Sequence, residues 1–237
     1  MLRWEQQFAD AALADAFGFH ALQLGLRDLD ALRNNRIGRR WLGVQGLEAP
    51  EPAQTPATDG SASTALLCEF DALPFPGRSL DLVVLAHALE QARDPHLALA
   101  EVERVLVPEG RLLILGINPA SLWGWRRPRG PGGTPGELIG YRRLRDWLRL
   151  LSFEVEAARF GCFRPPLTQS AWLERFAWME PVGERWWPVF GAVYALQAVK
   201  RVRGMRLVGL ARRQARYASA PRTAVTVRQR RQGPPLA

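Results

Sequence analysis

The feature that most constrains the fold is a pair of short, almost uninterrupted apolar runs at residues 80–86 and 112–117. Such runs predict parallel strands that are covered on both faces, because a strand with one face in water would alternate polar and apolar residues. Asp94 and Pro95, which lie between the runs, are typical of an N-cap and a first helical position, so a helix is expected from there to about Leu106. A connection of this length predicts a right-handed strand–helix–strand unit with parallel strands.

The remainder of the chain predicts further elements of the same kind: helices over residues 4–17 and 138–151, and strands over residues 20–25, 66–70, 153–160 and 192–202. Three segments have no clear period: residues 28–48, a Pro-rich and Ala-rich loop at 49–64, and an aromatic-rich insert at 161–188. In the first helix, Phe8, Ala12 and Phe17 fall near one face, and Glu5 lies away from that face. Strands that alternate with helices predict an α/β fold.

The formal net charge of +9 is carried by the C-terminal end of the chain. Residues 200–237 contain eleven basic and no acidic residues, and the rest of the chain is almost neutral. We therefore predict a folded domain at residues 1–203 and a basic, disordered tail at residues 204–237. The near-neutral domain disfavours a nucleic-acid-binding fold. The tail is either a solvated extension or a weak, salt-sensitive contact for nucleic acid or an anionic surface.

Three absences bear on location and chemistry. No apolar stretch reaches the ~18 residues that a transmembrane helix requires, so no transmembrane segment is expected. Glu5, Asp10 and Asp15 interrupt the apolar core that a signal peptide would need. Cys68 and Cys162 are too few for a disulfide framework, and no metal site is predicted. We therefore expect a cytoplasmic protein.

Polar residues follow several of the expected strands at their carboxyl ends. Gly25 ends the first strand, Glu69 and Asp71 end the next, and His87 and Asn118 follow the two apolar runs. In an open parallel sheet, ligands bind beyond these ends, near the point at which the strand order reverses. If the strands are parallel neighbours, the polar side chains gather at one edge of the sheet. Oxygen acceptors in that position suit ribose hydroxyls and an exocyclic amine.

Residues 66–119 resemble the second half of the class I, S-adenosylmethionine-dependent methyltransferases of the type 11 family. The marks that carry the resemblance are, in chain order, Leu73-Pro74-Phe75, Ser79-Leu80-Asp81, His87, Asp94-Pro95, Arg104-Val105-Leu106, Pro108 and Gly110. Gly18-Phe19-His20 and Asn118-Pro119-Ala120-Ser121 are similar to a bacterial subgroup of that family. The resemblance implies a Rossmann-like, mostly parallel seven-stranded sheet with flanking helices. It also implies S-adenosyl-L-methionine as the cofactor and a small-molecule or lipid-like methyl acceptor.

The same resemblance implies roles for individual residues. Gly25 would lie at the methionyl end of the cofactor, with Glu69 and Asp71 near its adenine or ribose. Ala86 and His87 would flank the transferred methyl group, and His87 is the candidate catalytic residue. Structural alternatives stay open: Gly25 as a strand end, Glu69 and Asp71 as turn residues, and His87 as the cap of the following helix.

The chain departs from the family's pattern in the cofactor loop. Gln23 replaces an acidic residue, and Arg27 and Leu29 stand where the second and third glycines are expected. Side chains at these positions would obstruct the approach of the backbone to the cofactor. A second hypothesis is therefore a catalytically inactive methyltransferase-fold protein that binds a protein or nucleic acid through its groove or its tail.

Overall fold

The computed structural model describes residues 1–45, 63–126, 138–164, 183, 185 and 187–201. Residues 1–202 form one compact unit. Its elements are, in chain order, α1 (Leu2–Leu13), β1 (His20–Gly25), β2 (Arg39–Val44), β3 (Ser63–Leu67), β4 (Leu80–Ala86), α2 (Ala88–Gln91), α3 (Pro95–Val105), β5 (Leu106–Ile117), α4 (Leu122–Arg126), α5 (Tyr141–Leu150), β6 (Phe153–Gly161), the 3₁₀ helix η1 (Pro188–Phe190) and β7 (Val193–Lys200).

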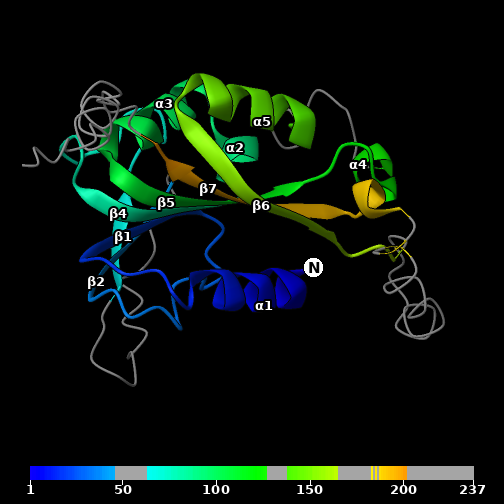
Figure 1. Cartoon of the computed structure of the whole chain (residues 1–237), viewed down its shortest axis with the longest axis horizontal. Coiled ribbons are helices and arrows are strands. Elements are labelled where there is room, and N and C mark those ends of the chain that lie inside the picture. Colours follow the sequence, from blue (N-terminus) through cyan, green and yellow to red (C-terminus); the bar gives the residue numbers. More distant parts are fainter. Residues whose placement is uncertain (46–62, 127–137, 165–182, 184, 186, 202–237) are drawn as a thin grey trace, which may run out of the picture. The chain divides into compact units, whose positions relative to one another are not determined.

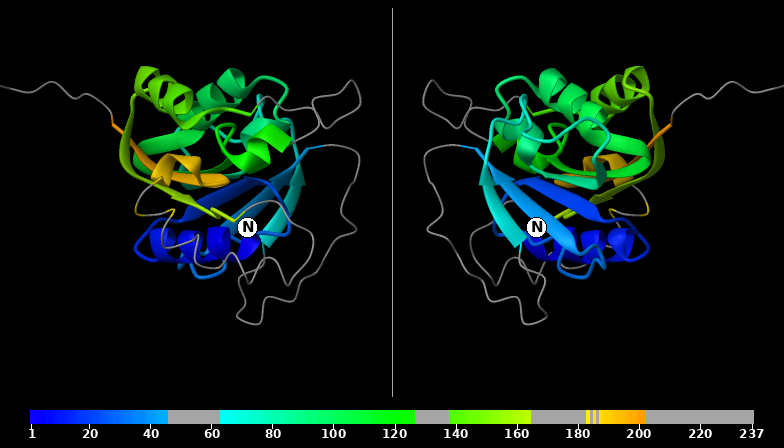
Figure 2. Two further views of the ribbon diagram at one scale, coloured as in Figure 1. Left: turned by 90° about the vertical axis from the view of Figure 1, so that its right-hand side faces the viewer. Right: turned by 90° about the vertical axis from the view of Figure 1, so that its left-hand side faces the viewer.

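All seven strands lie in one sheet, in the order β3-β2-β1-β4-β5-β7-β6. The pairs are parallel except for the two that β7 makes, with β5 and with β6. Helices α2, α3 and α5 cover one face of the sheet and α1 covers the other, as Figures 1 and 2 show. The predicted α/β fold with a mostly parallel seven-stranded sheet and flanking helices is therefore confirmed.

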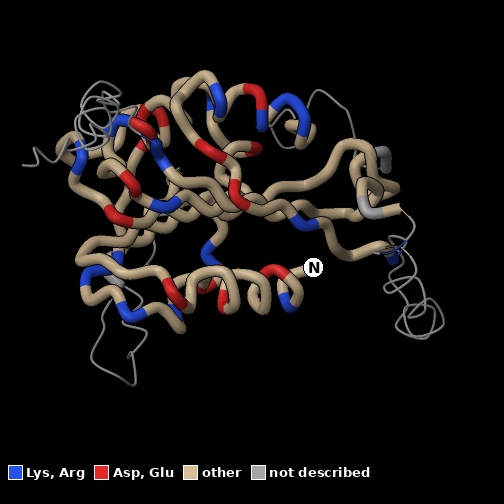
Figure 3. The backbone as a smooth tube through the Cα atoms, in the orientation of Figure 1, with Lys and Arg blue, Asp and Glu red and all other residues tan. Residues whose placement is uncertain are grey.

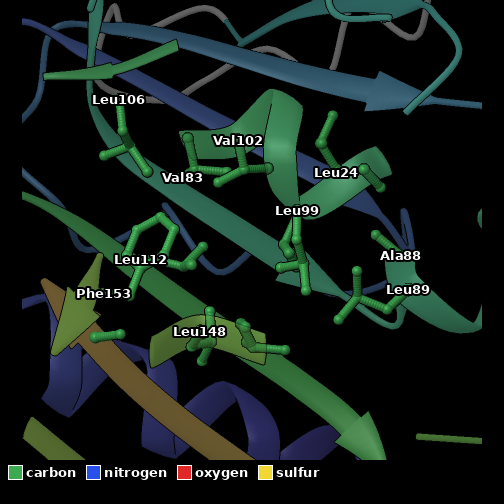
Figure 4. Close-up of a cluster of buried hydrophobic side chains, with 14 of the residues drawn as sticks. Leu24, Val83, Ala88, Leu89, Leu99, Val102, Leu106, Leu112, Leu148 and Phe153 are labelled. Carbon is green, nitrogen blue, oxygen red and sulfur yellow. The ribbon is translucent and has the colours of Figure 1, made fainter. Parts of the chain in front are cut away.

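The central strands lie in the interior of the domain because their apolar side chains are buried on both faces of the sheet. On the face below α2, α3 and α5, Leu24, Val83 and Leu112 are buried together with Leu99 and Val102 of α3 (Figure 4). Alternate residues of the same strands are buried in a second cluster, which includes residues of α1. Both faces are thus removed from water, which explains why β4 and the second half of β5 read as almost continuous apolar runs.

Helix α3 begins where the sequence predicts. The Asp94 carboxylate accepts hydrogen bonds from the backbone N–H groups of His96 (2.8 Å) and Leu97 (3.2 Å), and Pro95 occupies the first helical position. These bonds satisfy donors that have no partner inside the helix. The helix ends at Val105, and Leu106 already belongs to β5.

Arg104 joins the turn before β4 to the end of α3. Its guanidinium donates hydrogen bonds to the carbonyl groups of Leu73 (3.1 Å) and Phe75 (3.0 Å). The Glu101 carboxylate accepts one from Leu73 N–H (3.0 Å), and its ion pair with Arg104 lowers the pKa of Glu101. Leu73, Phe75 and Arg104, which all belong to the motifs of the family resemblance, are therefore in contact, and these contacts fix the path of the chain before β4.

Asp81 makes a second such link, between β4 and the segment before β1. Its Oδ2 accepts hydrogen bonds from Phe19 N–H (2.7 Å) and His20 N–H (2.9 Å). Position 18 must be glycine in this arrangement, because a Cβ atom there would overlap the Asp81 side chain. The contact sets where β1 begins.

Several predicted boundaries were wrong. The strand expected at residues 66–70 is β3, Ser63–Leu67, and β2 lies within the segment 28–48 that has no clear period. After β3 the chain turns, with Ala72 N–H donating to the Glu69 carbonyl at 3.3 Å. Phe70 in that turn is nevertheless buried in the core, so its hydrophobicity does not mark a strand. The helix expected over residues 4–17 ends at Leu13.

Among the described residues, no helix is both long and apolar enough to cross a membrane. Basic and acidic residues are interspersed along the described chain (Figure 3). The predicted tail at residues 204–237 and most of the aromatic-rich insert lie outside the described residues. The division into a domain and a tail therefore stays a prediction.

Candidate functional site

The site predicted by the sheet topology lies where β1 and β4 end side by side. Gly25 of β1 and Ala86 of β4 are register partners. Strand order reverses between these two strands, since β2 and β3 lie on one side of β1 and β5 lies beyond β4. This is the switch point at which open α/β sheets bind ligands. We call the ends of β1 to β5 the carboxyl edge.

Gly25 is required by its close approach to β4. It has a φ of +99°, and Leu26 N–H donates a hydrogen bond to the Ala86 carbonyl at 2.8 Å. A Cβ atom at position 25 would lie 2.2 Å from that carbonyl oxygen. The glycine is therefore explained by the sheet itself, and its place at the methionyl end of a cofactor stays a prediction.

Gln23 organises the loop that follows β1, a role that sequence reasoning missed. Its side chain is 3% exposed, and its amide group donates to the carbonyls of Leu26 (3.0 Å) and Leu29. Its Oε1 accepts a hydrogen bond from Ala31 N–H (3.0 Å). An acidic residue could accept from Ala31 but could not donate to the two carbonyls. The signal in the sequence was a polar amide inside a buried strand, which must find partners.

The departures at Arg27 and Leu29 differ in their outcome. Leu29 is buried in the cluster that contains Ala9 and Leu13 of α1, so its side chain fills the core beneath the sheet. Arg27 is exposed. The hydrogen bonds of Gln23 and the burial of Leu29 thus fix the conformation of this loop, which lacks the backbone freedom of a glycine-rich loop.

Oxygen acceptors gather at the ends of β2 and β3. Gln45, directly after β2, donates a hydrogen bond through Nε2 to Glu69 Oε2 at 2.6 Å. Glu69 is exposed and Asp71 is half-buried. At about 4.8 Å between neighbouring strands, the end of β3 lies about 10 Å from the end of β1. A nucleoside that reaches from Gly25 could meet these groups.

Cys68 lies beside this pair and is not a reactive thiol. Burial raises the pKa of Cys68 to about 11, and the charge of Glu69 adds to the effect. The thiol therefore stays protonated at neutral pH. No group of three His, Cys, Asp or Glu side chains among the described residues is placed to hold a metal ion.

His87 lies between two buried carboxyl groups, and we call Glu5, His87 and Glu90 the charged network. His87 Nε2 donates to Glu5 Oε1 at 3.1 Å, and its Nδ1 lies 3.6 Å from Glu90 Oε1. Burial lowers the pKa of His87, but the hydrogen bond to Glu5 and the two nearby carboxylates of Glu5 and Glu90 outweigh it and raise this pKa to about 10. The imidazole is thus an imidazolium at neutral pH and holds no free lone pair for a proton.

The charged network joins three elements at the carboxyl edge. Glu5 belongs to the first turn of α1, His87 follows β4 with a left-handed φ of 55°, and Glu90 belongs to α2. Glu90 Oε1 also accepts a hydrogen bond from Ile117 N–H at the end of β5 (2.7 Å). His87 occupies the N-cap position of α2, but its side chain makes no capping hydrogen bond. Its side chain serves the network instead.

The helix face predicted from Phe8, Ala12 and Phe17 is confirmed only in part, since Phe8 and Ala12 are partly buried against the core. Glu5, Ala9 and Leu13 are the buried residues of α1, whereas Phe17 beyond the helix is 73% exposed. The three positions are spaced by four residues, which places them on one helical face. A charged residue in line with Ala9 and Leu13 was the available signal for a buried partner.

Asn118 has a structural role. Its amide donates hydrogen bonds to the carbonyls of Val189 (2.6 Å) and Gly191 (2.9 Å), and its Oδ1 accepts one from Ala120 N–H (3.1 Å). These bonds tie the end of β5 to the segment that leads into β7. All side-chain groups of Asn118 are used, so it does not join the other acceptors at the carboxyl edge.

Comparison with known proteins agrees with this geometry. Residues 44–114 match the family model of a type 11 methyltransferase domain. The uncharacterized protein YafS of Escherichia coli (strain K12) is 42% identical over 93 residues, which are 37% of this chain and 39% of that protein. The ubiquinone/menaquinone biosynthesis C-methyltransferase UbiE of Paraburkholderia xenovorans is 45% identical over 56 residues, 24% of this chain and 23% of that protein. The chain thus matches well under half the length of these relatives.

Solved structures share the fold over most of the chain. An S-adenosylmethionine-dependent methyltransferase from Mesorhizobium loti has a TM-score of 0.61 and 15% identity, and the match covers 84% of this chain and 98% of that chain. The complex between the Haloferax volcanii Trm112 methyltransferase activator and a methyltransferase contains a chain with a TM-score of 0.63 and 21% identity, matched over 83% and 88%. These likenesses show the class I methyltransferase fold.

Proposed function

Since the chain belongs to the type 11 family of class I methyltransferases, we propose that it transfers a methyl group from S-adenosylmethionine to a small-molecule or lipid-like acceptor. One observation carries the proposal. The strand order reverses beside the register pair of Gly25 and Ala86, and the oxygen acceptors Gln45 and Glu69 lie at the ends of the adjoining strands. An elongated nucleoside with a charged end fits such an edge.

The residues present fit the cofactor in chemical type. Glu69 and Gln45, with Asp71 beyond them, would accept hydrogen bonds from ribose hydroxyls or an exocyclic amine. Gly25 and Ala86 would lie next to the methionyl end and the methyl group, with the Ala86 side chain itself buried in the cluster on the α1 face. The buried carboxyl groups of the charged network suit a nearby sulfonium cation. When bound, the cofactor would supply the electrophilic methyl group.

The chain's own part in the reaction would be binding and alignment. Class I transfer requires the acceptor atom in line with the breaking bond, and a fixed geometry of this kind contributes much of the rate. His87, the candidate catalytic residue, flanks that position in the proposal. As an imidazolium held by Glu5 it would orient its surroundings and would not remove a proton. The acceptor atom must therefore be nucleophilic without a base from His87.

The acceptor class draws support from the relatives. UbiE is described as a C-methyltransferase of ubiquinone and menaquinone biosynthesis, which supports a small or lipid-like acceptor for this chain. The match covers about a quarter of each protein, so the acceptor class of this chain is a proposal. The contact of the tail at residues 204–237 with nucleic acid or an anionic surface also stays a prediction.

Thermal unfolding with and without ligand tests the proposal. At a hundredfold excess over Kd, S-adenosylmethionine or S-adenosylhomocysteine should add ~2.7 kcal/mol to the free energy of unfolding. Glu69→Gln should weaken the shift with both ligands. Glu156→Gln is the matched control, because it removes a partly exposed carboxylate of β6 whose ion pair with Arg201 is long, at 4.0 Å. An unchanged midpoint of the wild-type chain at millimolar ligand would reject the proposal.

A further inference from the structure

The charged network has a fixed excess of negative charge. It contains two carboxyl groups and one imidazole, so with one proton shared among them its net charge is −1 wherever that proton lies. Within the described part of the chain, the ion pairs of Glu5 and Glu90 are with His87 alone. Glu5 is 1% and Glu90 5% exposed, so water screens this charge weakly.

The network also holds unused acceptors. Among the described residues, Glu5 Oε2 and Glu90 Oε2 are buried and have no hydrogen-bond partner. A buried acceptor without a partner is costly, and such groups persist mainly where a ligand, a water molecule or a function meets them. Stability alone therefore does not explain why two carboxyl groups converge on one imidazole.

The position of the network links it to the reacting end of the site. His87 directly follows Ala86, the register partner of Gly25. Glu90 accepts a hydrogen bond from the end of β5, and Glu5 approaches from α1 on the other face of the sheet. The uncompensated charge thus lies behind the carboxyl end of β4, and the acceptors for an adenosine lie two and three strands away.

We propose that the charged network is the specificity element of the methyl-transfer site: it favours the sulfonium cation over the neutral thioether product and disfavours anionic acceptors. The inference rests on the proposed function. A net negative charge in a weakly hydrated environment attracts a nearby cation and repels an anion, and it has no such effect on a neutral group. Product release and the choice of a neutral or cationic acceptor then follow from one feature.

Calorimetric titration of the full chain tests this without any knowledge of the acceptor. The measured quantity is the ratio of the Kd of S-adenosylhomocysteine to the Kd of S-adenosylmethionine, since the two ligands differ by the charged methyl group. Glu5→Gln brings the net charge of the network to zero, so this ratio should fall about tenfold, with the Kd of S-adenosylhomocysteine almost unchanged. Glu90→Gln should act in the same direction and carries the test if Glu5→Gln does not fold.

The matched control is the double variant Glu5→Gln/His87→Gln. It removes the same contact between α1 and β4 but leaves Glu90, and hence a net charge of −1, so it should keep the wild-type ratio. Glu69→Gln should weaken both ligands equally. Equal ratios in the wild type and both single variants would overturn the inference. In that case, binding of S-adenosylmethionine by the wild type would still support the proposed function. Failure of the wild type to bind either ligand would instead reject the proposed function.

Discussion

Replacing Gly25 with alanine should destabilise the chain severely, for reasons that precede any ligand. The φ of +99° is unfavourable for any residue with a Cβ atom, which costs about 1–2 kcal/mol. The added Cβ atom would lie 2.2 Å from the Ala86 carbonyl oxygen and 3.0 Å from Ala88 N, both of which are backbone atoms that cannot rotate away. Relieving such overlap in a packed sheet costs a further 1–3 kcal/mol or so. We expect a loss of about 3 kcal/mol.

Urea unfolding followed by circular dichroism measures this loss, and thermal unfolding should show a midpoint lowered by roughly 6–12 °C for a domain of this size. Gly38→Ala is the control, because no heavy atom lies within 4 Å of a Cβ atom built there. That variant should stay within about 0.5 kcal/mol of the wild type. A Gly25→Ala protein as stable as Gly38→Ala would refute the assignment of Gly25 to the packing of β1 against β4.

Three further predictions concern single side chains. Gln23→Glu restores the acidic residue of the family pattern but loses the donors to the Leu26 and Leu29 carbonyls, so it should lower the free energy of unfolding by about 2–4 kcal/mol at pH 7. Urea unfolding measures this loss, and a Gln23→Glu protein at least as stable as the wild type would contradict it. The pKa of His87 is raised from 6.5 to about 10. The protonated imidazole therefore contributes a few kcal/mol to the free energy of unfolding below pH 6.5, and this contribution is lost as the pH rises from 6.5 to about 10. His87→Gln should abolish this part of the pH dependence in urea titrations, and parallel curves for both proteins would exclude it. Asp94→Ala should cost about 1 kcal/mol by uncapping α3, whereas Asp94→Asn should keep most of the stability, as chemical denaturation can measure.

The centre of the fold could be predicted because its local signals agree with its tertiary environment. β4 reads as an apolar run and is buried on both faces, and Asp94 caps α3 as its sequence context indicates. The two outer strands on the β3 side of the sheet, β2 and β3, have weaker signals in their sequence. β2 begins with Arg39 and Arg40 and is only partly buried, and β3 precedes a turn in which Phe70 is as buried as a strand residue. Hydrophobicity alone cannot separate these cases.

The candidate site was predicted in part, because polar partners far apart in the sequence leave no periodic trace. Gly25, Ala86 and His87 were expected at the ends of the central strands, where the structure has them. The partner of His87 is Glu5, which is 82 residues away, and it had been assigned to another face of its helix. In the sequence, Gln23 indicates only the loss of the family's acidic residue. Its three bonds depend on a loop conformation that no local pattern specifies.

The link between Arg104 and the turn at Leu73 has a consequence for how relatives of this chain are sorted. These side chains hold the scaffold together, and a protein of this fold that transfers no methyl group would still need them. Selecting relatives by this stretch of sequence would therefore collect active methyltransferases together with inactive proteins of the same fold.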